Sequence, residues 1–366
     1  MNFHFKKETI KRIVVRGPNW LGDAVMCTPA LLMLRDIFPS ASITLLVRPS
    51  IAALFESHPS IDHMVVYDHK GNHSGWRGML NLVRMLRKER FDLAVLFQNA
   101  FGAALLMWLA GIPYRMGYPT DGRRLLLTES IPLPPDVTSL HQVKYYQGLV
   151  SLFEDSGKRY LPTLNVRNDE EENITEKLKA CSVREDDFVI GLNPGSVYGG
   201  AERWLPERFA EAADRIVESI LTHQDKGIAV HCVIVGAPGE ENLGRTIASR
   251  MLNPPIVLSG KTTLQHLMAV IKRCQLFVTN DTGPMHIANA FGVPIVAIFG
   301  PTDHRTTSPF HGPFSIVRHP VDCSPCLLRE CPIDHRCMTN VTVEEVLRSA
   351  EQLVSPSRSP QMRSLG

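Results

Sequence analysis

The chain has 366 residues, more than one ordinary domain needs and a comfortable length for two. Hydrophobic residues make up 44% of it and charged residues 21%, a composition that excludes a mainly disordered chain, a collagen-like fibre and a small disulfide scaffold. The 39 Lys and Arg residues only slightly outnumber the 37 Asp and Glu residues, which excludes a protein that binds nucleic acid through bulk charge.

Apolar runs in this sequence are too short for a membrane span. The most apolar window, residues 101–111, has about half of the ~20 residues that a spanning helix needs. Charged residues near the N-terminus stand where a signal peptide would have its apolar region, so we expect a cytoplasmic protein. Four scattered cysteines are expected to be buried, reduced thiols: Cys27, Cys181, Cys232 and Cys274.

Short apolar runs alternate with helical patterns along most of the chain. The predicted strands are 12–15, 43–47, 64–67, 93–97, 188–192, 230–235, 256–258, 276–279 and 294–299, and helices are predicted at 77–89, 206–220, 264–274 and 285–291. The strands are rich in Val, Ile, Leu and Phe with little alternation, which is typical of a parallel sheet covered on both faces. Because the strand–helix–strand rhythm occurs twice, we expect two doubly wound α/β units.

The polar, acidic segment 157–187 marks the expected boundary between the two units. We therefore predict an N-terminal domain over 1–165 and a C-terminal domain over 166–354. The tail, 355–366, has the composition of a disordered segment.

The first predicted strand runs into the glycine-containing loop RGPNWLGDA, residues 16–24. Its two glycines resemble the phosphate loop of nucleoside triphosphatases, but Asp23 and Ala24 stand where that loop needs Lys and Ser or Thr. The spacing of a dinucleotide-binding loop is also absent. A carboxylate at the carboxyl edge of a sheet suits a general base, and we expect the helix dipole to keep Asp23 ionised. The alternative is a helix N-cap.

Several polar loops follow the strands of the second half. The loop NPGS, at 193–196, offers backbone N–H groups and a hydroxyl to a phosphate, and Arg203 follows as a candidate to neutralise a leaving diphosphate. Glu240 is placed to accept hydrogen bonds from a ribose, or is simply an acid at a helix start. Lys261 is a candidate to contact phosphate; the alternative is that its side chain is simply solvated.

The string TNDTGPMH, at 279–286, ends a predicted strand and opens a helix. Asp281 and Thr282 are candidate N-caps, and the first helical N–H groups face the edge of the sheet. His286 lies one turn further on, where it faces either a ligand or the core. Together these loops predict one pocket of the size of a nucleotide sugar.

The motifs now resemble a known family. NWLGDAVMCTPAL, NPGS with ERW, GAPGEEN, LSGKTTL, TNDTGPMHIANAFGVPIVAIFGPTD and CSPCLLRECPIDHRCM are similar to those of glycosyltransferase family 9, in the same order and over residues 12 to about 354. Within that family the chain resembles the bacterial lipopolysaccharide heptosyltransferases, and NWLGDAVM favours type II, the heptosyltransferase II group, over type I.

The resemblance implies a GT-B architecture, in which two Rossmann-like domains face each other across a cleft. It implies inverting, metal-independent transfer without a cofactor, from ADP-L-glycero-β-D-manno-heptose to the first heptose of the inner core on Kdo–lipid A. The C-terminal domain would bind the donor and the N-terminal domain the acceptor. A lipid-linked acceptor also implies peripheral contact with the cytoplasmic face of the inner membrane.

Site residues follow from the same resemblance. Asp23 would be the general base, and Asp281 would contact the donor heptose. The implied donor contacts are Gly195 and Ser196 at the diphosphate, Glu240 at the ribose, Thr262 beside the adenine, and Thr282 and Gly283 at the phosphates, with Arg203, Lys261 and His286 as further candidates.

One position departs from the family pattern. Related sequences usually have a lysine two residues before the tryptophan that is Trp204 here, and this chain has Glu202. Arg203 and Lys261 are the cations left to compensate. In the first domain most cations are expected to be solvated, with a subset near the acceptor and the membrane: Lys6, Lys7, Lys11, Arg16, Arg84, Arg87, Lys88, Arg115, Arg123 and Arg124.

Four further cysteines are clustered, Cys323, Cys326, Cys331 and Cys337, with His335 nearby. They supply enough ligands for zinc or an iron–sulfur centre, but their spacing is not that of two C-x-x-C knuckles, and reduced thiols or a disulfide are the alternatives. No catalytic metal is expected. The alternatives to the heptosyltransferase function are a family 9 transferase with another acceptor or nucleotide sugar, and a non-catalytic relative that binds nucleotide or metal.

Overall fold

The computed structural model describes residues 4–153, 157–223 and 227–355. Its chain divides into two compact units, Met1–Asn165 and Val166–Gly366. From residue 356 onward the tail for which disorder is predicted lies outside the described residues. No helix in the described part of the chain is both long and apolar enough to span a membrane.

Unit 1 contains a six-stranded parallel sheet in the order β3-β2-β1-β4-β5-β6. The strands are β1 (Arg12–Arg16), β2 (Ser42–Val47), β3 (His63–Val66), β4 (Leu93–Leu96), β5 (Tyr114–Gly117) and β6 (Glu129–Ser130). The helices are α1 (Leu21–Met26), α2 (Thr28–Ile37), α3 (Pro49–Ala52), α4 (Gly75–Lys88), α5 (Phe101–Leu109) and α6 (Gln142–Val150), with 3-10 turns η1 (Lys7–Thr9), η2 (Ala53–Phe55) and η3 (Arg123–Leu126).

Unit 2 contains a second six-stranded parallel sheet, in the order β12-β11-β10-β7-β8-β9. The strands are β7 (Phe188–Asn193), β8 (Val230–Ile234), β9 (Ile256–Val257), β10 (Leu276–Asn280), β11 (Ile295–Phe299) and β12 (Phe314–Arg318). The helices are α7 (Asn168–Ala180), α8 (Pro206–His223), α9 (Glu241–Ala248), α10 (Leu264–Arg273), α11 (Gly283–Ala290), α12 (His304–Thr307), α13 (Arg336–Thr339) and α14 (Val343–Val354), with η4 (Gly200–Glu202).

Both sheets have the same topology. Counted along the chain within each unit, the strand order is 3-2-1-4-5-6, so the order reverses between β1 and β4 in unit 1 and between β7 and β10 in unit 2. In open α/β sheets, ligands bind beyond the carboxyl ends of the strands at such a reversal. Each unit therefore has one preferred place for a binding site.

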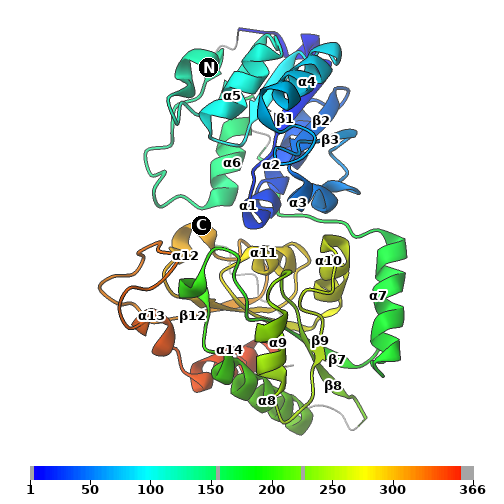
Figure 1. The fold of residues 1–366 in the computed structure, drawn as a ribbon, viewed down its shortest axis with the longest axis vertical. Coiled ribbons are helices and arrows are strands. Elements are labelled where there is room, and N and C mark those ends of the chain that lie inside the picture. Colours follow the sequence, from blue (N-terminus) through cyan, green and yellow to red (C-terminus); the bar gives the residue numbers. More distant parts are fainter. Residues whose placement is uncertain (1–3, 154–156, 224–226, 356–366) are drawn as a thin grey trace. The chain divides into compact units, whose positions relative to one another are not determined.

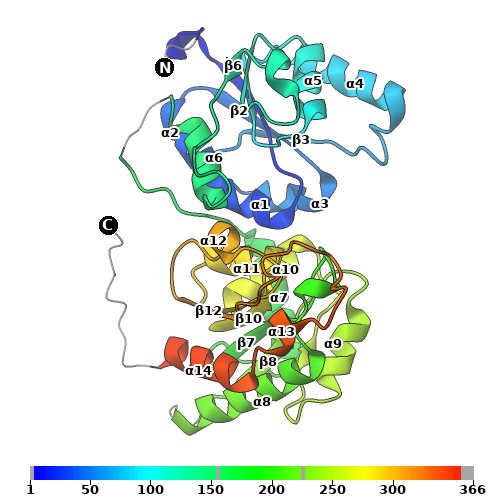
Figure 2. The same ribbon diagram turned by 90° about the vertical axis from the view of Figure 1, so that its left-hand side faces the viewer.

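Helices cover both faces of each sheet. In unit 1, α4 and α5 pack against apolar residues of β1, β2 and β4 on one face, and Figure 2 shows α1, α2, α3 and α6 on the other. In unit 2, residues of α8, α9, α13 and α14 share one apolar core with β7, β8, β10 and β11. The opposite face is covered by α10 and α11 (Figure 1).

The sequence located nine of the twelve strands, each within two residues of its observed ends, and the four predicted helices. It missed β5, β6 and β12, which are short or lie at or next to sheet edges and carry few of the long apolar runs that mark a central strand. The expectation for Cys181 was wrong: it is exposed, because the turn after α7 lies at the surface, whereas Cys27, Cys232 and Cys274 are buried and all are free thiols.

Trp204 anchors the core of unit 2. Its side chain is fully buried, its ring lies edge-on to Phe209 with centroids 5.1 Å apart, and its indole Nε1 donates to the carbonyl oxygen of Val341 at 3.1 Å. This contact joins the loop before α8 to the segment before α14.

Trp204→Ala should lower the free energy of unfolding of unit 2 by about 3–5 kcal/mol, because it leaves a large cavity and removes the indole hydrogen bond to Val341, whose carbonyl oxygen keeps the donor from Arg208. Urea unfolding followed by far-ultraviolet circular dichroism measures this. Trp108→Ala, at an exposed tryptophan of unit 1, is the control and should change stability by less than about 1 kcal/mol. Equal losses in the two variants would contradict the anchoring role.

Candidate functional site

Asp23 lies beyond the carboxyl end of β1, in the first turn of α1. Its carboxylate accepts a hydrogen bond of 3.1 Å from the hydroxyl of Tyr146 on α6, and the residue keeps partial contact with solvent. Trp20 occupies the N-cap position, so the alternative interpretation of Asp23 as an N-cap is wrong.

The expectation that the helix dipole keeps Asp23 readily ionised needs correction. Burial raises the pKa of the Asp23 carboxyl above its usual value, and the hydrogen bond from Tyr146 opposes that rise only in part. Asp23 is the third residue of a helix of only six residues, so the helix dipole lowers its pKa weakly. Burial of the carboxyl raises the pKa more than the dipole lowers it. A raised pKa makes Asp23 a stronger base once it is ionised, which suits proton abstraction.

The loop that leads to Asp23 is held by Arg16 at the end of β1. The guanidinium of Arg16 donates to the carbonyl oxygens of Gly17 at 2.6 Å and Leu46 at 3.2 Å, and to Oδ1 of Asn19 at 2.8 Å. Arg16 is 2% exposed, and burial lowers its pKa to about 10. Arg16 was one of ten cations of which most were expected to be solvated and a subset to lie near the acceptor; it is not solvated, and its charge satisfies buried loop carbonyls.

A second buried arginine, Arg123, organises the loops after β4 and β5. It donates to the carbonyl oxygens of Gln98 and Tyr118 and to Oδ1 of Asn99, which also accepts from the hydroxyl of Tyr145 at 3.1 Å. Arg123, another of those ten cations, has no exposed surface and is therefore not solvated. Its donors are consumed within the protein and are not offered to an acceptor.

Helix α6 was not predicted, yet it brings two tyrosines to this edge: Tyr145 at Asn99 and Tyr146 at Asp23. The available signal was the helical spacing of Val143, Tyr146 and Val150 in HQVKYYQGLV, which places one face of α6 against the core.

In unit 2 the loops at the strand reversal are joined by Asn280, which is fully buried at the end of β10. Its amide nitrogen donates to the carbonyl oxygens of Pro194 at 2.8 Å and Gly195 at 3.3 Å, and its Oδ1 accepts from the backbone N–H of Trp204 at 3.1 Å. This one side chain fixes both ends of the 194–204 loop. Sequence analysis quoted Asn280 within a motif but gave it no role.

Ser196 does not present a free hydroxyl. It is buried, and its Oγ donates to Oε2 of Glu202 at 2.5 Å while accepting from the backbone N–H of Tyr198 at 3.2 Å. Glu202, at the position where the family resemblance led us to expect lysine, is 5% exposed. Burial and the nearby Asp281 carboxylate raise the pKa of Glu202 to about 7, against the opposing hydrogen bond from Ser196.

Asp281 is likewise buried, and its carboxylate accepts from the hydroxyl of Thr307 at 3.0 Å. Burial raises the pKa of Asp281 to about 6. At pH 7 Glu202 is therefore about half protonated, whereas Asp281 is mostly ionised, so the negative charge that a ligand would meet in these loops is reduced mainly at Glu202.

Arg203 and Glu240 meet beside Gly195. Nη2 of Arg203 donates to the carbonyl oxygen of Ser196 at 2.9 Å and lies 3.4 Å from Oε1 of Glu240. A Cβ on Gly195 would come within 2.1 Å of the Glu240 carboxylate, so a larger residue at this position would displace the Glu240 side chain. Among the described residues, the buried Nε of Arg203 and Oγ of Ser259 lack hydrogen-bond partners, which leaves donors for a ligand.

The remaining candidates lie in neighbouring loops. Lys261 is exposed, with its ammonium 3.1 Å from the carbonyl oxygen of Val257, and Thr262 is half-buried. Thr282 holds the N-cap position of α11 without a side-chain capping hydrogen bond, and Gly283 begins that helix. His286 is buried. The contacts therefore join Gly195, Ser196, Arg203 and Glu240, and Asp281 acts on this group electrostatically through Glu202.

The segment that carries the four clustered cysteines, residues 323–337, is hydrogen-bonded to the 194–204 loop. Backbone Ala201 N–H donates to the carbonyl oxygen of Arg329 at 2.9 Å, and Nε2 of His335 lies 2.7 Å from the carbonyl oxygen of Ala201. The clustered cysteines are free thiols, and Cys337 has its pKa raised to about 11 by burial and then by the neighbouring thiols. In the described part of the chain no three His, Cys, Asp or Glu side chains are arranged to hold a metal.

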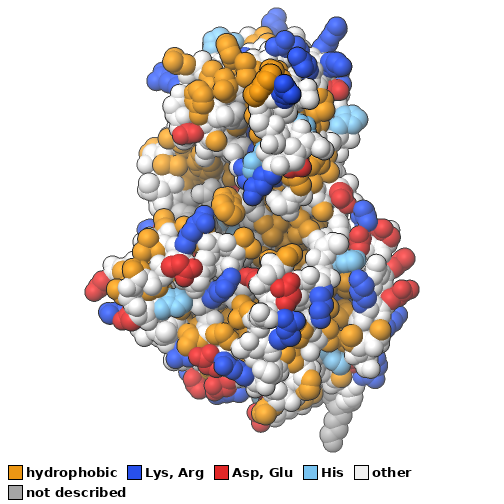
Figure 3. Space-filling view, viewed as in Figure 1, with side chains coloured by type: hydrophobic (Ala, Val, Ile, Leu, Met, Phe, Trp, Pro, Cys, Tyr) orange, Lys and Arg blue, Asp and Glu red, His pale blue; other side chains and the backbone are white. Residues whose placement is uncertain are grey.

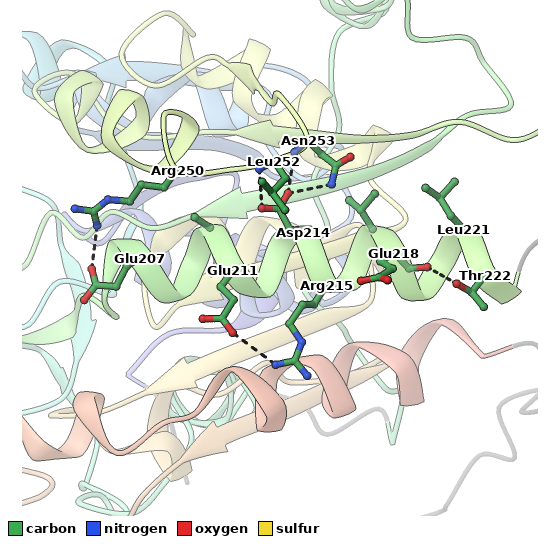
Figure 4. Close-up of a pocket in the computed structure, with 12 residues that line it drawn as sticks. Glu207, Glu211, Asp214, Arg215, Glu218, Leu221, Thr222, Arg250, Leu252 and Asn253 are labelled. Carbon is green, nitrogen blue, oxygen red and sulfur yellow. Dashed lines mark hydrogen bonds and ion pairs between the residues drawn. The ribbon is translucent and has the colours of Figure 1, made fainter.

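A surface groove elsewhere in unit 2 is lined by α8 and the 250–253 segment (Figure 4). Its polar groups are paired: Arg250 with Glu207 at 3.1 Å, and Asp214 with the backbone N–H groups of Leu252 and Asn253. No loop from the strand reversal contributes to it, so it is separate from the candidate site.

Glu202→Gln should change how stability depends on pH. Because the folded-state pKa of about 7 exceeds the ordinary value of 4.5, protonated Glu202 stabilises the fold below about pH 4.5, and this contribution is lost as pH rises through 7. The wild-type free energy of unfolding should fall by up to about 3 kcal/mol more than that of Glu202→Gln across this window. Urea unfolding at several pH values measures it.

Glu207→Gln, at an exposed glutamate of α8, is the matched control and should keep the wild-type profile. Parallel profiles for the wild type and Glu202→Gln would show that Glu202 is not held in its neutral form.

Comparison with known proteins agrees with the geometry. A family model described as glycosyltransferase family 9 (heptosyltransferase) matches residues 79–336. A Campylobacter jejuni protein named lipooligosaccharide heptosyltransferase 2 is 28% identical over 356 residues, covering 94% of this chain and 100% of the relative.

Two solved structures share the fold. The glycosyl transferase family 9 protein from Veillonella parvula has a TM-score of 0.81 at 26% identity and covers 94% of this chain and 97% of its own. E. coli ADP-heptose LPS heptosyltransferase II has a TM-score of 0.76 at 24% identity, covering 93% and 98%. The predicted GT-B class is confirmed, with one parallel α/β sheet in each unit. The family model spans well over half of the chain, and the protein belongs to glycosyltransferase family 9, the heptosyltransferase family.

Proposed function

We propose that this enzyme transfers heptose from ADP-L-glycero-β-D-manno-heptose to the first heptose of the lipopolysaccharide inner core, with inversion and without a metal or cofactor. The observation that carries the proposal is the Asp23 carboxyl, which is partly accessible, held by one hydrogen bond from Tyr146 and has a raised pKa. The names of similar proteins, lipooligosaccharide heptosyltransferase 2 and ADP-heptose LPS heptosyltransferase II, support an ADP-heptose donor and a lipopolysaccharide or lipooligosaccharide acceptor; the heptose isomer and the acceptor position are part of the proposal.

In the proposed reaction, Asp23 takes the proton of the acceptor hydroxyl. The acceptor oxygen then forms a bond to the anomeric carbon of the donor, and the bond from that carbon to the β-phosphate oxygen breaks. Its electron pair leaves with ADP. Tyr146 keeps the Asp23 carboxylate oriented and partly offsets the cost of its burial.

The donor diphosphate would bind at the 194–204 loop of unit 2. Arg203 supplies a positive charge and a free Nε donor, and the Asn280 side chain holds the loop in one conformation before the donor arrives. Preorganised donors of this kind stabilise the charge that develops on a leaving diphosphate. Glu240, Lys261, Thr262, Thr282, Gly283 and His286 complete the proposed donor site, which belongs to residues 166–354.

With Glu202 in place of lysine, the proposed donor site has a carboxyl group where a positively charged ammonium group would otherwise stand. Below about pH 7 its carboxyl is largely neutral and does not repel the diphosphate, and the nearby Asp281 favours that neutral form. Arg203 is then the cation in direct contact with the loop. We infer that protonated Glu202 tolerates the donor phosphate without repelling it, whereas a lysine at this position would form an ion pair with the phosphate.

Two alternative functions remain to be tested. One is transfer by a family 9 enzyme that uses another nucleotide sugar or acceptor, and the other is binding of a nucleotide or metal without catalysis. Calorimetric titration with ADP, GDP and UDP separates them. Selective binding of ADP agrees with the proposal, preference for another nucleotide indicates another donor, and no binding excludes nucleotide-sugar transfer. An assay with ADP-heptose and core acceptor truncated after the first heptose then tests the acceptor.

Asp23→Asn should lower the transfer rate by about 10²–10⁴-fold, the usual contribution of a general base, while ADP affinity stays within about twofold. Initial rates with a delipidated, water-soluble core acceptor, together with ADP titration of the same preparation, measure both quantities. Near-normal turnover would refute the assignment of Asp23 as the base.

Tyr146→Phe should move the acidic limb of the kcat/KM profile to higher pH. Its hydroxyl favours the ionised form of Asp23, so its removal raises the Asp23 pKa and more base is protonated at a given pH. Tyr145→Phe, which removes the neighbouring hydroxyl bonded to Asn99, is the control and should leave the limb in place. An unmoved limb in Tyr146→Phe counts against Asp23 as the titrating base.

A further inference from the structure

One face of unit 1 exposes an unusual amount of apolar surface. The exposed large apolar side chains of α4, α5 and η3 are Trp76, Leu80, Met85, Phe101, Trp108 and Leu125, which we call the outer patch. Leu125 is 95% exposed, Trp76 69% and Trp108 51%. These side chains cost free energy in water unless something covers them.

The three elements of the outer patch are in contact with one another. Helix α4 packs on α5, and α5 packs on η3. Nη2 of Arg87 on α4 donates to the carbonyl oxygen of Leu109 at the end of α5, at 2.6 Å. Figures 1 and 2 both show α4 and α5 side by side on one side of the sheet. The apolar side chains therefore belong to one surface and not to scattered sites.

Helix α5 has no polar face at all. Its sequence is FGAALLMWL, and Ala103, Ala104, Leu106 and Met107 already face the core. Phe101 and Trp108 lie two turns apart on the outer side, with half-buried Leu105 between them. A helix that is apolar all round is expected to be covered on all sides, and this one is covered on one side only.

Cations surround the apolar side chains. Among residues 75–126, all of which the structure describes, the exposed charged side chains are six cations and one acid: Arg77, Arg84, Arg87, Lys88, Arg90 and Arg124 against Asp121. The outer face of α4 carries Trp76 and Leu80 together with Arg77, Arg84 and Lys88. Figure 3 shows hydrophobic and basic side chains intermixed over α4 and α5.

This chemistry fits an anionic lipid surface. Tryptophan and leucine side chains enter the boundary between headgroups and acyl chains, while long basic side chains reach back to lipid phosphates. A second copy of the chain would bring six like charges against six, so self-association through this patch is opposed by its own charge. Each basic side chain near an anionic leaflet strengthens the attraction to it.

We propose that the outer patch docks unit 1 onto an anionic bilayer, with α4 and α5 lying along the headgroup boundary. The inference deepens the proposed function, since a lipid-linked acceptor is reached at such a surface, and it rests on that function for its biological purpose. The docking surface excludes Arg16 and Arg123, whose charges are used inside unit 1.

The test is flotation of the full chain with vesicles of phosphatidylethanolamine and phosphatidylglycerol, compared with phosphatidylcholine alone. The wild type should float with the anionic vesicles, less so in high salt. Trp76→Ala with Trp108→Ala should weaken partitioning about tenfold or more, because two interfacial aromatic anchors are lost. Arg77→Gln, Arg84→Gln and Lys88→Gln together should weaken it to a similar extent and remove most of the salt dependence.

Matched controls come from unit 2. Leu221→Ala with Leu252→Ala removes two exposed leucines, and Lys177→Gln with Arg245→Gln removes two exposed cations; both pairs should leave flotation unchanged. Failure of the wild type to float, or equal flotation by the Trp76/Trp108 variant, overturns the proposal. A change of oligomeric state in that variant without vesicles would also overturn it, in favour of self-association.

Transfer to the water-soluble acceptor distinguishes this inference from the proposed function. The Trp76/Trp108 variant should keep wild-type rates with that acceptor while losing flotation. Asp23→Asn should float normally while losing transfer. Flotation without transfer by the wild type would reject the proposed function alone, and transfer without flotation would reject the docking surface alone.

Discussion

Neighbouring strands of a parallel sheet can be joined only by a crossover connection that returns the chain to the starting edge, and this constraint organises each of the two units. All strand ends of one kind then meet at one edge of each sheet. Where the strand order reverses, the two neighbouring connections leave in opposite directions and separate. Asp23, Asn280 and Asp281 all lie at these reversals because of chain topology.

Within this frame, buried polar side chains give the loops their shape. Arg16 and Arg123 in unit 1, and Asn280 in unit 2, each satisfy two or more backbone groups of loops that would otherwise be held by water. Buried groups of this kind are costly unless fully bonded, so they favour one loop conformation over others. Rigidity at the site therefore comes from residues that are not expected to touch a substrate.

The carboxyl groups of the site follow a different physical rule. Asp23, Glu202 and Asp281 all have pKa values raised by burial. For Asp23 this produces a stronger base, and for Glu202 it produces an acid that is near neutral where a diphosphate is proposed to bind. The same desolvation thus supports opposite roles, depending on whether the group must hold a proton or take one.

Sequence by itself determined the two α/β units, the family and the strand ends at which polar loops would gather, because apolar runs, helical spacing and short motifs are local properties of the chain. It did not reveal helix α6 beside Asp23, the burial of Arg16 and Arg123, or the pairing of Ser196 with Glu202. Each depends on residues distant in sequence: Tyr146 lies 123 positions from Asp23. Only the tertiary structure decided which charges meet solvent and which meet a buried partner, since desolvation is a property of the packed neighbourhood and not of the residue.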